Sequence, residues 1–286
     1  MKKFLTNILK FAAFVIPFYI IGLCIWSWIT PPFLAKNVRS NIAAYGHFFS
    51  RSRDAENIKN PDILFLGSSH AYRGFDTRVF SQANISSFNL GSSAQSPINS
   101  QVLLKQYLQK IKPKLVVYEV YAGTLSIDGV ESSLDMLING KIDKNSIEMS
   151  FKINNLMTYQ TLMYGYFRQT FNLNKNIQEP AKQNEDFYIS GGGFVETKYR
   201  NYTPEHLEKS KWQLNEQQIV ALKENIKLLK ESKTPFILVQ APITKTLYHS
   251  KTNNKEVDDI LKKLGPYKDF QNEIVLDDKK DFYDNN

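Results

Sequence analysis

Two serines and a histidine directly follow a short apolar run in this sequence. The run Ile63–Leu66 predicts a buried strand, and it stops at Gly67-Ser68-Ser69-His70. In open α/β sheets, ligands bind at the edge where the carboxyl ends of the strands lie, so these side chains are candidates for chemistry. A serine hydroxyl attacks an acyl carbon when a neighbouring base removes its proton. The alternative is an ordinary strand-to-helix turn in which a serine caps the next helix.

A second turn of the same composition follows the next predicted strand. Residues Ser87–Leu90 predict a strand that ends in Gly91-Ser92-Ser93, so Ser92 and Ser93 are rival nucleophiles. The loop after them leads to Ser96-Pro97, a helix cap followed by proline at the first helical position. This context favours a loop role for the second pair and makes Ser69 the stronger candidate.

One acidic residue lies within a predicted apolar strand. Leu115–Val120 is the third strand, and Glu119 interrupts its apolar pattern. A carboxylate at this position is either a buried polar anchor or a side chain that lines the site. The sequence leaves both roles open.

Metal, nucleotide and nucleic-acid sites find no support in the sequence. Cys24 is the only cysteine, and the histidines show no ligand spacing, so neither a metal nor an organic cofactor is expected. Gly67-Ser68-Ser69-His70 lacks the glycines and the lysine of a phosphate-binding loop. The net charge of +8 is scattered, which suits an anionic membrane or envelope polymer and forms no nucleic-acid-binding stripe. The four histidines are His47, His70, His206 and His249.

Strands and amphipathic helices alternate along most of the chain. Helices are predicted over residues 97–111, 215–229 and 257–264, and two further strands at 236–239 and 273–276. This alternation predicts an α/β fold whose mostly parallel five-stranded sheet carries helices on both faces. Residues 124–212 break the pattern and are rich in Asn, Tyr and Phe. We expect an insertion there, which is either a lid or partner surface over the active face or a purely structural addition.

The amino-terminal segment predicts a membrane anchor. Residues 11–29 carry no formal charge, follow Lys2, Lys3 and Lys10, and contain Trp26 and Trp28 near their far end. About 20 apolar residues span a bilayer as a helix, whereas the apolar region of a signal peptide is usually shorter. The predicted organisation is a transmembrane helix at 1–30, a polar linker at 31–60 with helical character over 38–49, and a globular domain at 61–286. The short basic amino terminus favours a globular domain outside the cytoplasmic membrane.

The turns after the first two strands and the Asp-rich terminal segment together resemble the SGNH (GDSL-like) hydrolase superfamily. Within it, the chain is similar to the membrane-anchored bacterial envelope branch, which includes teichoic-acid D-alanyl-transfer and alginate O-acetylation proteins. The resemblance covers residues 61–121 and 234–286. It implies a flavodoxin-like three-layer α/β/α domain in which Ser69 is the nucleophile. It also implies that the N–H groups of Ser69 and Gly91 stabilise the oxyanion.

The sequence departs from the family pattern in two places. The third family block supplies an oxyanion-binding asparagine, but residues 118–123 here contain none. The last block is Asp-x-x-His, and Asp284-Asn285-Asn286 fits its first three positions while the sequence given holds no histidine after them. Three explanations of the absent histidine are considered. The sequence is part of a longer working enzyme, the protein is a pseudoenzyme, or the base comes from elsewhere. Asp284 is the expected partner of that base.

The resemblance implies an acyl-transfer function at the cell envelope. The expected protein is an extracytoplasmic serine esterase or O-acyltransferase that moves acyl groups, above all acetyl, to or from envelope glycans. Its partners would be an acylated glycan or another small ester, with Ser68, His70 and Glu119 as candidate substrate contacts, and a membrane-bound acyltransferase. The contrasting hypothesis is a non-catalytic, membrane-tethered binding or assembly protein.

Overall fold

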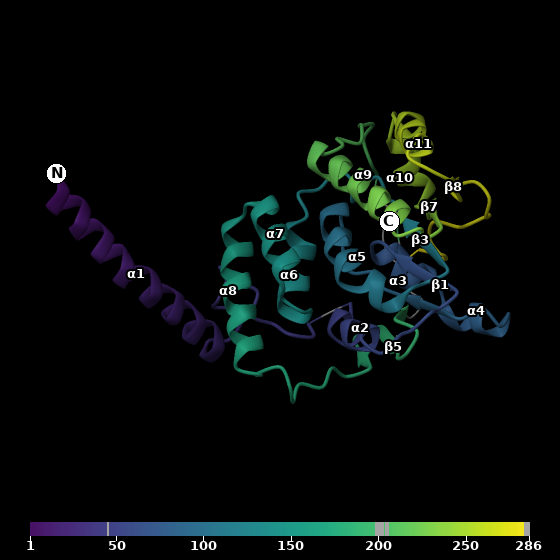
Figure 1. Cartoon of the computed structure of the whole chain (residues 1–286). Helices are drawn as coiled ribbons and strands as arrows, with labels where there is room; N and C mark the ends of the chain where they lie inside the picture. The colour runs from purple at the N-terminus through teal and green to yellow at the C-terminus, as the bar shows by residue number, and fades with distance from the viewer. Residues whose placement is uncertain (45, 198–202, 204–205, 283–286) are drawn as a thin grey trace.

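The computed structural model describes residues 1–44, 46–197, 203 and 206–282. Within them, five parallel strands form a sheet in the order β2-β1-β3-β7-β8 (Figure 1). The predicted α/β fold with a parallel sheet is therefore confirmed. The strands are β1 (Ile63–Leu66), β2 (Ser87–Asn89), β3 (Leu115–Glu119), β7 (Phe236–Gln240) and β8 (Tyr267–Asp269).

The predicted position of the fifth strand is wrong. Residues 273–276 form no strand, and Val275 is 96% exposed. The chain pairs with β7 as soon as it leaves the preceding helix, because Leu238 N–H donates to the carbonyl of Pro266. The three residues of β8 therefore fill this edge of the sheet before the apolar run at 273–276 is reached.

The two faces of the sheet are covered unequally. Helices α5 (Pro97–Ile111) and α9 (Glu216–Glu231) pack against each other over one face, and α11 (Asn254–Lys262) adds Val257 and Leu261 to the same apolar core. The other face buries Phe65, Val117 and Val239 beneath aromatic side chains. The segments on this second face are short, and they include α4 (Thr77–Gln82).

The insertion forms a helical layer outside α5 and a small separate sheet. Its helices α6 (Val130–Asn139), α7 (Lys144–Ile153) and α8 (Leu156–Thr170) lie between α5 and the amino-terminal helix (Figure 1). Side chains of α6 and α7 join the main apolar core, so this part of the insertion belongs to the body of the domain. The antiparallel sheet consists of β4 (Lys182–Gln183), β5 (Asp186–Ile189) and β6 (Phe194–Thr197).

The amino-terminal helix α1 (Lys2–Ile29) is long enough and apolar enough to cross a membrane. Most of its side chains are exposed, and it projects from the rest of the chain (Figure 1). Its second half contacts α8 and buries Leu23, Cys24 and Ser27.

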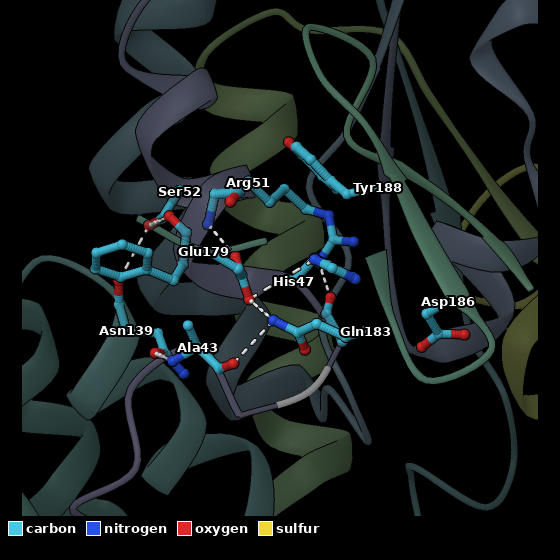
Figure 2. A network of polar contacts seen from close by, with 12 residues as sticks. Ala43, His47, Arg51, Ser52, Asn139, Glu179, Gln183, Asp186 and Tyr188 are labelled. Carbon is cyan, nitrogen blue, oxygen red and sulfur yellow. Dashed lines mark hydrogen bonds and ion pairs between the residues drawn. The ribbon is translucent and has the colours of Figure 1, made fainter. Parts of the chain in front are cut away.

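The segment 31–60, expected to form a polar linker, contributes several buried side chains to the domain. Helix α2 (Phe48–Ala55) begins about ten residues later than the predicted helix and contributes Phe48 and Ala55 to the main core. Arg51 and Ser52 of this segment are buried and donate hydrogen bonds to backbone carbonyls of the insertion. Figure 2 shows this network, in which Glu179 accepts a hydrogen bond from Ser50 N–H and lies 3.7 Å from His47 Nδ1.

A second buried carboxylate lies in the same region, on α6. Asp135 accepts a hydrogen bond of 2.6 Å from Asn139, whose side-chain oxygen in turn accepts the N–H of Ala43. Burial raises the pKa of Asp135 to about 7, and the hydrogen bond from Asn139 opposes that shift. The folded chain therefore keeps this proton at pH values where the unfolded chain has lost it.

Replacing Asp135 by Asn is expected to remove a pH-dependent loss of stability. A raised carboxyl pKa makes the free energy of unfolding fall as the pH rises from about 4 to about 7, by up to about 1.4 kcal/mol per pH unit. D135N should match the parent protein below pH 4 and exceed it increasingly up to pH 7 in urea denaturation. The exposed E208Q variant is the control, and equal pH profiles for D135N and the parent would contradict the assignment.

Candidate functional site

The predicted turn at the end of β1 begins a short helix, α3 (Ser69–Gly74). Ser68 is its cap, and its hydroxyl oxygen accepts the N–H of His70 at 3.3 Å. Ser69 is the first helical residue and is half-buried. Ser68 therefore caps the next helix, as the alternative interpretation of this turn predicted. Ser69 has no capping role.

Glu119, the last residue of β3, lies directly behind this turn. Its side chain is fully buried, and its Oε2 accepts both the N–H of Ser68 at 2.8 Å and the hydroxyl of Ser68 at 2.9 Å. Its Oε1 lies 3.6 Å from Nδ1 of His70. Glu119 is thus a buried polar anchor that holds the turn, in contact with Ser68 and His70.

A cavity of about 470 Å³ opens at this carboxyl edge of the sheet. Ser68, Ser69 and His70 form one wall of it, so the structure brings together three of the predicted site residues. Gly46 from the segment before α2 also contributes, which the sequence did not indicate because that segment resembles a linker in composition. Other walls include Tyr72, Ser93, Tyr121 and Glu131.

Gly91 does not have the predicted oxyanion-binding geometry. Its N–H donates to the side-chain oxygen of Asn89 at 3.0 Å, and its carbonyl accepts from Arg51. Asn89 lies two residues earlier and captures the N–H locally, so this donor is not available to the cavity. In contrast, the N–H of Ser69 has no acceptor in the described part of the chain, as its predicted role requires.

The rival serines have other partners. The hydroxyl of Ser92 is buried and donates to Gln95 at 2.9 Å. Ser93 lines the cavity but shares a hydrogen bond of 3.1 Å with the hydroxyl of Tyr72. Ala94, which follows, adopts a left-handed backbone with φ of 48°. A non-glycine residue in this region carries backbone strain, and such strain is found more often at functional sites.

His70 shares the cavity with Ser69. Its ring packs against Tyr121 with centroids 4.5 Å apart, and neither ring nitrogen has a hydrogen-bond partner among the described residues. The other histidines do not line this cavity, since His47 is buried in the network of Figure 2 and both His206 and His249 are exposed. Asp284 lies outside the described residues.

Within the described ranges, no group of three or more metal-ligating side chains comes together. Comparison with protein-family models and with curated proteins finds no match for this chain. The function is therefore inferred from the geometry of the site itself. It combines a serine hydroxyl, an adjacent free N–H, and an imidazole that faces a buried carboxylate.

Replacing Gly67 by Ala is expected to disturb this site, because Gly67 packs directly against Glu119. An added Cβ would lie 2.6 Å from both Cβ and Oε2 of Glu119, and the backbone φ is 146°. We expect a loss of about 1–3 kcal/mol in the free energy of unfolding, measured by urea denaturation. Gly74 is the matched control, since an added Cβ there meets nothing within 4 Å. Equal stability of G67A and G74A would show that this close packing does not matter.

Proposed function

We propose that this chain is a membrane-anchored, extracytoplasmic serine esterase or O-acyltransferase of the SGNH type. Its substrates in this proposal are acyl groups, above all acetyl, on cell-envelope glycans. The observation that carries the proposal is that Ser69 and His70 share a cavity at the carboxyl edge of a parallel sheet, in front of the buried carboxylate of Glu119. The same proposal includes a three-layer α/β/α domain of the SGNH type.

The chemistry begins with attack by Ser69 Oγ on the carbonyl carbon of an ester. The hydroxyl proton passes to Nε2 of His70, and the carboxylate of Glu119, 3.6 Å from Nδ1, stabilises the imidazolium that forms. The N–H of Ser69 donates to the oxygen that becomes negative. The ester C–O bond then breaks, and the leaving alcohol takes the proton from His70. Water or an acceptor hydroxyl releases the acyl group from Ser69 by the same steps in reverse.

Ser69 Oγ makes no direct hydrogen bond to His70 in the described structure. Catalytic hydrogen bonds are often long without substrate and tighten when it binds, or they run through a water molecule. The cavity has room for both a water and a substrate, since pockets for small ligands are commonly about 300–1,000 Å³.

A glycan-bound acyl group suits the composition of the cavity and the character of the chain. The walls mix hydroxyl groups with the aromatic rings of Tyr72 and Tyr121, which is the kind of surface that sugars and short acyl chains contact. The apolar helix α1 and the net charge of +8 suit a location beside anionic envelope components.

The contrasting function is a non-catalytic binding or assembly protein that uses the same cavity. The lack of a direct hydrogen bond between Ser69 and any base in the described residues favours it. Covalent labelling of the serine separates the two functions.

Ser69→Ala is expected to abolish reaction with a fluorophosphonate probe. The probe phosphonylates a serine only when its hydroxyl is activated, so labelling reports the nucleophile independently of the natural substrate. Ser93→Ala is the matched control, because Ser93 lines the same cavity and should leave labelling unchanged. Labelling is measured by mass spectrometry of the full chain. A parent protein that does not react would support the binding function.

His70→Gln is expected to slow labelling by about 10²–10⁴-fold, which is the usual contribution of a general base. Glu119→Gln should also slow it, because the imidazole loses the carboxylate that faces Nδ1. Glu131→Gln, on another wall of the cavity, serves as control, and circular dichroism checks that each variant is folded. If H70Q reacts at the parent rate, the base lies elsewhere, with the region of Asp284 as the next place to test.

A further inference from the structure

Helix α1 lies against the domain over part of its length. Gln160 of α8 donates a hydrogen bond of 2.6 Å to the hydroxyl of Tyr19, and Cys24 Sγ lies 3.8 Å from the carbonyl of Met163. Leu23 and Cys24 are buried by this packing, and Figure 1 shows α1 leaving the body of the chain beside α8. These contacts run from Tyr19, near the middle of the uncharged run at 11–29, into its second half.

The length of that run places α8 at the membrane. A helix rises 1.5 Å per residue, so about 20 residues cross a hydrocarbon layer of about 30 Å. The uncharged run at 11–29 is about that long, so a bilayer that it spans needs nearly all of it. Because the second half of this run packs on α8, α8 reaches the level of the lipid.

The outer surface of α8 has the composition of a helix in contact with lipid. Its only charged residue is Arg168, which is 8% exposed and donates to Tyr164 and Asn174. Its large exposed side chains are Leu156, 70% exposed, and Tyr166, 56% exposed. The other exposed residues of α8, Gln169 and Thr170, are polar but uncharged. A helix that faces water normally carries charges on its outer side, whereas this one exposes none.

Neighbouring segments extend the same surface. The turn after α1 exposes Phe33 and Leu34, and the residues that follow it pack along α8 through Ala35 and Val38. Phe171, at the end of α8, is also exposed and contacts Phe167 with ring centroids 4.9 Å apart. Lys36 and Lys175 are exposed nearby in sequence and suit anionic headgroups.

We propose that α8, with Phe33, Leu34 and Phe171, rests in the interface of the bilayer that α1 spans. The occupant of this surface is lipid because the surface continues from the membrane helix and presents no exposed charge along α8. Tyrosine is also enriched at the boundary between headgroups and acyl chains. The inference rests on the membrane anchoring in the proposed function and does not depend on the acyl chemistry. The domain would then hold one orientation on the membrane.

The test uses spin labels on the full chain in vesicles of equal parts phosphatidylcholine and phosphatidylglycerol. Cys24 is first replaced by Ser, and single cysteines are placed at Leu156, Tyr166 and Phe171. Oxygen concentrates in lipid and a nickel chelate stays in water, so power saturation with each reports where a label lies. We expect all three labels to be more accessible to oxygen than to nickel.

Two reference positions make the result decisive. Phe14 in α1 should give the lipid signature, and Val220 on α9, exposed and remote from α8, should give the water signature. If the α8 labels resemble Val220 while Phe14 reports lipid, the proposal is wrong. Labels shielded from both reagents would mean that protein covers this surface, which also overturns it. A water signature at Phe14 would overturn the anchoring itself, and the fluorophosphonate result would stand apart from all of these outcomes.

Discussion

The site depends on one buried carboxylate, that of Glu119. Removing a carboxylate from water costs several kcal/mol, so it is tolerated only where hydrogen bonds replace its hydration. Ser68 supplies two of them through its N–H and its hydroxyl. The same requirement explains Gly67, because the backbone must come so close to Glu119 that no side chain fits between them. The direction in which the chain leaves β1, and hence the position of Ser69, follows from this contact.

The sequence was sufficient for the parts of the fold that depend on local pattern. Apolar runs marked β1, β3 and β7, the Gly91-Ser92-Ser93 turn marked the end of β2, and end signals marked α5, α9 and α11. It was not sufficient for β8, whose residues Tyr267–Asp269 are only half-buried and include two charged side chains. An edge strand of that kind has no apolar pattern to detect, whereas the nearby run at 273–276 has the pattern and lies outside the sheet.

The location of the candidate site at the end of β1 was predictable, and its surroundings were less so. Ser69 follows a recognisable strand, and Glu119 stood out as a charge in an apolar run. The capture of the Gly91 N–H by Asn89 is a local effect, and the spacing of an asparagine two residues before the glycine could have indicated it. The contribution of Gly46 could not be foreseen, because it depends on tertiary packing of a polar segment.

Arg51 on α2 connects the parts of the domain that are farthest apart along the chain. Its guanidinium is fully buried and donates to the carbonyls of Gly46, Gly91 and Gly193, which lie 5, 40 and 142 residues away. During synthesis the amino-terminal residues emerge first, so α2 is made long before Gly193 exists. The charge of Arg51 must therefore stay hydrated until the insertion has been made. Burial of α2 is consequently a late event in folding.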